Sequence, residues 1–377
     1  MITQTIPFHL PYLSGEEDKY LKDAIIRRSF SGNGFYTKLC EFELKQLTSA
    51  SKVLLTSSCT HALEMCALLL NIEEGDEVIM SSFNFVSAAN AFVLRGAKIV
   101  FVDVDPKTMN IDPLHIPEAI TERTKVILAM HYGGVACDME AIMGIAKKHG
   151  IKVVEDAAHC IDAYWNGQHL GTIGDLGTIS FHATKNIHCG EGGALLVNND
   201  TYGELAEIIR EKGTNRTAFQ KGFVDKYRWI ALGSSYLMSE LNAAFLYSQI
   251  INVSAVTKAR KVVYEMYHHG FEAFNSENRF CDLVMSNAHV YYLINPTLKP
   301  VEQFAERLLQ KGIQTAFHYP PLHKSPKGVQ ICHFSGEDVF TTKLSRNLIR
   351  LPIYSDLNQE VVIDVVKTVN DVIEELN

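Results

Sequence analysis

The chain has 377 residues, 47% of them hydrophobic and 21% charged, with a formal net charge of −8. At about 150 residues per domain, this length predicts two or three domains whose core needs no disulfide or metal. The acidic balance argues against a nucleic-acid partner. The N-terminus lacks a signal-peptide pattern and no run of about 18 apolar residues occurs, so we expect a cytoplasmic protein without membrane insertion.

The first half of the chain alternates helices and strands. Ser14 and Glu17 form a capping box that opens a helix running to about Arg28. Ser57 and Ser58 are expected to cap a helix over residues 60–71. We expect further helices over 88–95 and 138–149, and apolar strands over 52–56, 77–80, 98–104, 125–131 and 152–156. This alternation predicts a mostly parallel sheet with helices on both faces.

The pattern becomes more irregular after residue 156. Strands are expected over 178–182 and 193–198, then a helix over 201–211 and one long helix from about 238 to 268. A second strand–helix pattern begins near residue 286. We therefore expect an N-terminal arm (1–12), a large domain (13–245) and a smaller C-terminal α/β domain (246–377).

Three segments carry candidate chemistry, although each alone has an ordinary explanation. Lys185 follows a strand beside a glycine-rich turn, but loop lysines are usually solvated. Asp156 ends a buried strand, where a carboxylate needs a cation, yet alone it is better explained by an ordinary salt bridge or a helix cap. Residues 57–60 begin a helix, whose free N–H groups bind anions or are simply capped.

Together these segments fit one cofactor. Proteins bind pyridoxal 5′-phosphate (PLP) with three groups. These are a lysine that bonds to its aldehyde, a carboxylate that holds the proton on its pyridine nitrogen, and a phosphate site at a helix N-terminus. Ser58, Thr60 and Ser180 are the candidate phosphate contacts. Phe85 is either a ring that stacks on the cofactor or a core aromatic.

Nearly the whole chain, from about residue 5, resembles the DegT/DnrJ/StrS family of nucleotide-sugar aminotransferases. The segments that carry the resemblance are PFHLPYLSGEE (7–17), SSCTHALEM (57–65), VVEDAAH (153–159), SFHATKNIHCGEGGALL (180–196) and HYPPLH (318–323). Residues 75–112, 131–139, 209–216 and 233–246 are similar to the subgroup that forms dTDP-4-amino-4,6-dideoxygalactose.

The resemblance implies the type I PLP aminotransferase fold and a homodimer with shared active sites. It implies that Lys185 carries the cofactor and is the catalytic base. Asp156 would pair with the ring nitrogen, Phe85 would stack on the ring, and the phosphate would lie on Ser180, Cys59 and Thr60. It also points to sugar-nucleotide or donor contacts from Lys212, Asn215, Arg216, His318, Tyr319 and His323.

The chain departs from the family pattern at three positions. His159 stands where glutamine is usual and could donate to the phenolic oxygen of the cofactor. Leu237 stands where many relatives have an asparagine that reaches the partner's phosphate, and Asn84 replaces a threonine.

The implied reaction is amino transfer from L-glutamate to C4 of dTDP-4-dehydro-6-deoxy-D-glucose, for surface polysaccharide synthesis. Amination at C3, the gluco epimer at C4, and a PLP-binding regulator without turnover remain open. The presence of Lys185 argues against the dehydratases of the family. Eight scattered cysteines without a CxxC pair are expected to be reduced, and fifteen histidines without zinc spacing predict no metal site.

Overall fold

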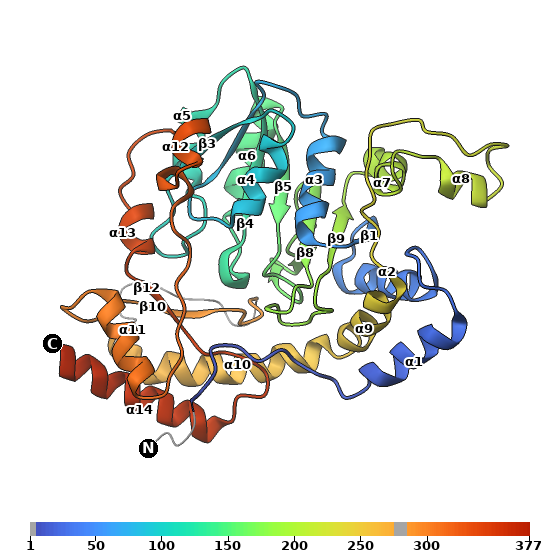
Figure 1. Ribbon diagram of the computed structural model, residues 1–377. Helices are drawn as coiled ribbons and strands as arrows, with labels where there is room; N and C mark the ends of the chain where they lie inside the picture. Colours follow the sequence, from blue (N-terminus) through green and yellow to red (C-terminus); the bar gives the residue numbers. More distant parts are fainter. Residues whose placement is uncertain (1–4, 275–284) are drawn as a thin grey trace.

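A computed structural model describes residues 5–274 and 285–377 (Figure 1). Its centre is an eight-stranded sheet with the order β1-β9-β8-β5-β4-β2-β3-β11. These strands are β1 Lys52–Thr56, β2 Glu77–Ser81, β3 Lys98–Val102, β4 Thr124–Met130, β5 Lys152–Asp156, β8 Leu176–Ser180, β9 Gly193–Val197 and β11 Cys332–Phe334. Strand β9 is antiparallel to both of its neighbours, β1 and β8, and all other pairings within this sheet are parallel. The mostly parallel sheet is therefore confirmed.

Helices cover both faces because successive side chains of the strands point to opposite sides. On β4, Val126 and Leu128 pack toward α3, α4 and α7, whereas Ile127 and Ala129 pack toward α5 and α6. Helices α1, α2 and α9 cover β1, β8 and β9 on the second face. The helices so far are α1 Glu17–Arg27, α2 Phe35–Thr48, α3 Cys59–Leu69, α4 Val86–Val93, α5 Ile116–Ala119, α6 Met139–His149, α7 Gly203–Arg210 and α9 Glu240–Ile250.

Two sequence predictions about helices are wrong. The single long helix over 238–268 is two helices, α9 and α10 (Val253–Gly270), interrupted at 251–252. Asn252 makes the break, since its side-chain amide donates to the Ser248 carbonyl and its own carbonyl starts the next helix. The N-cap of α1 is Glu16 and the helix begins at Glu17, so Ser14 is not the N-cap, although the Glu17 carboxylate still accepts the Ser14 N–H at 2.6 Å.

Helices α10, α11 and α14 of the C-terminal part lie below the large sheet in the view of Figure 1, whereas α12 and α13 lie beside it. Helices α10, α11 and α14 pack with the two-stranded β10–β12 sheet around their own core. Strand β11 belongs to the same part of the sequence but pairs with β3 at the edge of the large sheet. The remaining elements are α8 Arg216–Gln220, β6 Tyr164–Trp165, β7 Gln168–His169, β10 Tyr291–Ile294, α11 Val301–Gln310, α12 Gly328–Ile331, α13 Thr341–Ser345, β12 Leu348–Leu351 and α14 Gln359–Leu376.

The described cysteines are all free thiols, buried except for the half-buried Cys332. Cys281 lies outside the described residues. Among those residues no helix is long and apolar enough to cross a bilayer.

Candidate active site

A cavity of about 540 Å³ opens where the parallel strands of the large sheet end. Its lining includes Met130 from the end of β4, Asp156 from β5 and Ser180 from β8. Ligands of open parallel sheets bind at this edge. The structure brings ten of the predicted site residues to this cavity: Ser58, Cys59, Thr60, Phe85, Asp156, His159, Ser180, Lys185, His318 and Tyr319.

Lys185 is held by the tight loop between β8 and β9. The loop is closed by backbone hydrogen bonds from Ala183 to Gly190 and from Lys185 to His182, both shorter than 3 Å. The lysine side chain faces the cavity, where burial lowers the pKa of its amine to about 8. A neutral amine attacks an aldehyde, so this environment would suit the predicted covalent binding of the cofactor by Lys185.

Asp156 is a buried carboxylate, 5% exposed, at the end of β5. Its Oδ1 accepts the Ala158 N–H at 3.1 Å, and it makes no ion pair within the described residues. Burial raises the pKa of Asp156, an effect opposed by the Ala158 N–H and by the charge of Lys185. The ordinary salt bridge that the sequence left open is therefore absent here, and a protonated pyridine nitrogen would supply the missing cation.

The N-terminus of α3 also lines the cavity, with Ser58, Cys59 and Thr60. Ser58 caps the helix by accepting the His61 N–H at 3.1 Å, as predicted. The N–H groups of Cys59 and Thr60 begin the helix and so lack intrahelical acceptors. Strand β9 passes so close that a Cβ on Gly193 would lie 2.4 Å from the Cys59 nitrogen. This close approach and the N–H groups fit a phosphate.

His159 is a neutral hydrogen-bond donor toward the cavity. The Gly133 N–H donates to its Nδ1 at 3.1 Å, so the ring hydrogen lies on Nε2, which is 3.4 Å from the Tyr319 hydroxyl. Burial lowers the pKa of His159 well below its usual value, and Lys185 adds to this effect. The ring therefore keeps one tautomer, which suits a donor to a phenolic oxygen of the cofactor.

Phe85 lies at the cavity margin and is 56% exposed, with its ring centroid 6.2 Å from that of Tyr319. It is not a core aromatic, which leaves stacking on the cofactor as its predicted role. The neighbouring Asn84 is buried, and its Nδ2 has no hydrogen-bond partner in the described structure.

Four predicted substrate contacts do not reach the cavity of their own chain. Three of these residues lie outside the cavity, in the segment that follows α7 and enters α8: Lys212, Asn215 and Arg216. Asn215 is used there to order the segment, by bonds to the backbone at 226 and 228. His323 is instead held between Ser82 and Asp338, at 2.6 and 2.9 Å.

The cavity also contains residues that sequence reasoning did not single out. They include Phe8 and His9 from the N-terminal segment, Arg260 from α10, His289, and Arg350 from β12. His9 stands in a segment that resembles the family, which was the one available signal. The two arginines lie in a helix and a strand, and the local sequence there predicts secondary structure but no binding site.

Comparison with known proteins identifies the family to which this chain belongs. The model of the DegT/DnrJ/EryC1/StrS aminotransferase family matches residues 11–370. The chain belongs to this family. An uncharacterised protein, MJ1066 of Methanocaldococcus jannaschii, is 34% identical over 85% of both chains, and the spore coat polysaccharide biosynthesis protein SpsC of Bacillus subtilis is 28% identical over 98% of this chain and 97% of its own.

Solved structures agree with this assignment. The aminotransferase TlmJ of Streptoalloteichus hindustanus has a TM-score of 0.90 and 26% identity, covering 99% of this chain and 100% of its own. The PLP form of Spr1654 from Streptococcus pneumoniae, a putative sugar aminotransferase, has a TM-score of 0.87 and 25% identity over 99% of this chain and 98% of its own. The type I fold is confirmed, and the protein is a PLP-dependent sugar aminotransferase.

The residues of this aminotransferase fit PLP on their own chemistry. The amine of Lys185 has a lowered pKa, the buried Asp156 carboxylate lacks a cation, and the start of α3 offers uncommitted N–H groups beside Gly193. When bound, PLP supplies an electron sink for bond changes at the carbon that bears the amino group.

Proposed function

We propose that this aminotransferase moves the amino group of L-glutamate to C4 of dTDP-4-dehydro-6-deoxy-D-glucose. The products are 2-oxoglutarate and dTDP-4-amino-4,6-dideoxy-D-galactose, a precursor of surface polysaccharide made in the cytoplasm. The observation that carries the choice of sugar is the similarity of residues 75–112 and 233–246 to the subgroup with this product. The name of SpsC, a polysaccharide biosynthesis protein, agrees with a sugar destined for a polymer.

The side chains of the cavity have different roles in amino transfer. Lys185 takes a proton from the α-carbon of the donor and later delivers one to C4 of the sugar, because an amine with a pKa of about 8 serves as base and acid near neutral pH. Asp156 would hold a proton on the ring nitrogen. The N–H groups of Cys59 and Thr60, with Ser180, would bind the phosphate, and His159 would donate to the phenolic oxygen.

We further propose that the active enzyme is a homodimer whose cavities are completed by the partner chain. The segment over 212–236, which follows α7 and includes α8, projects from the body of the chain (Figure 1). It exposes large apolar side chains, with Phe223 at 78% and Trp229 at 76%. Apolar groups gathered on a projecting segment favour burial against another protein. Lys212, Asn215 and Arg216 lie on this segment and would then serve the partner's cavity.

Two measurements test these proposals. The purified enzyme, given L-glutamate and dTDP-4-dehydro-6-deoxy-D-glucose, should form a product whose NMR spectrum shows an axial amino group at C4. A product with an equatorial amine at C4, or with an amine at C3, would show that the proposed product is wrong. An absence of turnover would favour a PLP-binding regulator. Light scattering should give twice the chain mass of 42.2 kDa, and serine at both Phe223 and Trp229 should shift it toward the single-chain value.

A further inference from the structure

The imidazole of His289 offers the cavity a hydrogen-bond acceptor of known orientation. His289 lies just before β10, lines the cavity and is 5% exposed. Its Nδ1 is 2.7 Å from Oδ1 of Asn186, whose Nδ2 donates to the Asn287 carbonyl at 3.0 Å. Because a carbonyl only accepts, the NH₂ group of Asn186 faces Asn287 and its oxygen faces the ring. The ring hydrogen of His289 is therefore on Nδ1, and Nε2 carries a lone pair.

The Nε2 atom of His289 has no hydrogen-bond partner within residues 5–274 and 285–377. Polar groups inside proteins are nearly always hydrogen-bonded, because an unpaired one costs free energy. The backbone around the ring is fixed, since Arg260 donates to the carbonyls of Ala288 and His289 at 3.1 and 2.8 Å. This contact holds Ala288 in the left-handed region, with a φ of 51°. A ligand bound in the cavity can supply the missing donor.

The charges around His289 favour an uncharged donor. Burial lowers the pKa of His289 well below its usual value, so the ring is neutral and accepts near neutral pH. His159 lowers this pKa further, and so do three cations: Lys185, Arg260 and Arg350. The same cations repel an ammonium group that approaches the ring. A hydroxyl group has a hydrogen to donate and no charge, so it suits this position.

His289 lies beside the groups that act on the reacting carbon. Its ring centroid is 4.4 Å from that of His159, the predicted donor to the cofactor. Asn186, which fixes its tautomer, directly follows Lys185, the predicted acid and base at C4 of the sugar. The proposed sugar has hydroxyls at C2 and C3 and none at C6, and the C3 hydroxyl is on the carbon next to C4. L-Glutamate has no alcohol hydroxyl.

We propose that Nε2 of His289 accepts a hydrogen bond from the C3 hydroxyl of the sugar substrate. The inference rests on the proposed function and adds a residue that selects the site of amination. A sugar with its ketone at C3 would place a carbonyl oxygen, another acceptor, against the lone pair of Nε2. Such a sugar is disfavoured because two acceptors cannot pair. His289 thereby favours amination at C4 over C3.

The test is a double-mutant cycle between His289 and the C3 hydroxyl. The ligand is dTDP-6-deoxy-D-galactose, which has a hydroxyl in place of the C4 amino group and so is not turned over. Calorimetry measures its binding to the PLP holoenzyme. Its 3-deoxy analogue should bind wild-type enzyme about 3- to 10-fold more weakly, the range for one neutral hydrogen bond.

Two variants of His289 separate its acceptor from its structural role. In His289→Asn the amide nitrogen takes the place of Nδ1 and keeps the bond to Asn186, but no acceptor stands at the Nε2 position. This variant should bind the parent ligand about 3- to 10-fold more weakly and should bind the 3-deoxy analogue equally well. In His289→Gln the amide oxygen reaches the Nε2 position, so the preference for the parent ligand should return in part.

His333→Asn is the matched control, because His333 is exposed and outside the cavity. It should bind both ligands as the wild type does, and the cofactor absorbance of each variant shows that its site is intact. Unchanged binding of the parent ligand by His289→Asn would overturn the inference. So would a preference for the parent over the 3-deoxy analogue that is as large in His289→Asn as in the wild type. If wild-type enzyme forms no amine at C4, the proposed function itself fails; turnover at C4 with no coupling in the cycle refutes only the role of His289.

Discussion

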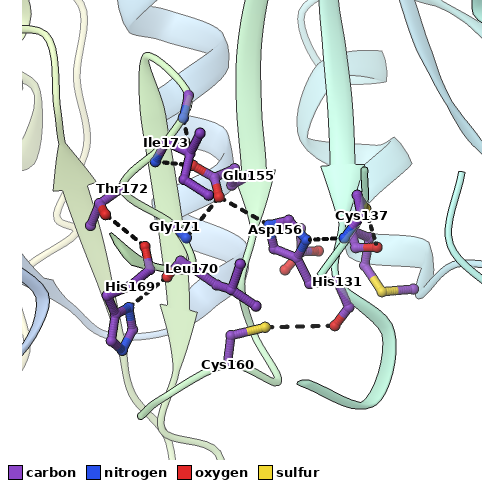
Figure 2. A network of polar contacts seen from close by, with 12 residues as sticks. His131, Cys137, Glu155, Asp156, Cys160, His169, Leu170, Gly171, Thr172 and Ile173 are labelled. Atoms are coloured by element: carbon purple, nitrogen blue, oxygen red, sulfur yellow. Dashed lines mark hydrogen bonds and ion pairs between the residues drawn. The ribbon is translucent and has the colours of Figure 1, made fainter. Parts of the chain in front are cut away.

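Replacing Glu155 with glutamine should destabilise the enzyme, although the two side chains have nearly the same shape. Glu155 precedes Asp156 on β5 and is fully buried. Figure 2 shows its carboxylate at the centre of a network that joins β5 to the loop before β8 and to His131. The oxygens accept N–H groups from Gly171, Ile173 and Gly174 at 2.6 to 2.8 Å, and the Nε2–H of His131 at 3.0 Å.

The expected cost follows from counting donors. His131 cannot change its tautomer to accept a bond, because its Nδ1 already accepts the Cys137 N–H at 3.0 Å. Glutamine has one acceptor oxygen, so two of the four donors would face an NH₂ group. Each unsatisfied buried donor costs about 1 to 3 kcal/mol, which gives about 2 to 6 kcal/mol. For 377 residues the unfolding entropy is about 0.8 kcal/mol per kelvin, so the melting temperature should fall by about 3 to 8 °C.

Thermal unfolding followed by circular dichroism measures this change, with Glu122→Gln as the control at an exposed position. The control should melt within about 1 °C of the wild type, as expected for a surface substitution. If the melting temperature of Glu155→Gln equals that of the control, the four hydrogen bonds do not contribute to stability as argued. Such a result would also mean that the end of β5, which positions Asp156, is held by other contacts.

Two further predictions concern the cofactor. The variant Asp156→Asn should still bind PLP, as its absorbance would show. Its turnover should be about 10²- to 10⁴-fold slower, because an amide does not hold the ring nitrogen protonated. Turnover near the wild-type rate would show that Asp156 has no such role. The rate at which apoprotein takes up PLP should rise about tenfold per pH unit and level off near pH 8, because burial disfavours the ammonium form of Lys185. A rate that keeps rising to pH 10 would indicate a lysine with the usual pKa.

The sequence was most informative where structure is local. Residues 152–156 form the predicted strand, since a short run of apolar residues bounded by a glycine and a loop has few alternatives. The cap at Ser58 depends only on the next three residues and was also predicted. Lys185 and Asp156 were predicted from the chemistry of the cofactor, and the structure places both in the cavity, Asp156 at the end of β5 and Lys185 in the loop after β8.

The features that the sequence missed depend on contacts between distant residues. Arg350 becomes part of the cavity because β12 lies near the N-terminal segment and His318, which no local pattern indicates. The partners of Glu155 lie sixteen or more residues away and are mostly backbone N–H groups, which every residue except proline has. The break between α9 and α10 falls in a stretch whose composition favours helix on both sides.

The most direct test of the central claim is to locate the residue that carries the cofactor. Holoenzyme is reduced with borohydride, digested, and the labelled peptide is sequenced by mass spectrometry. The cavity geometry predicts that the label lies on Lys185, and that Lys185→Ala has neither label nor turnover. A label on any other lysine, or turnover by Lys185→Ala, would contradict the account.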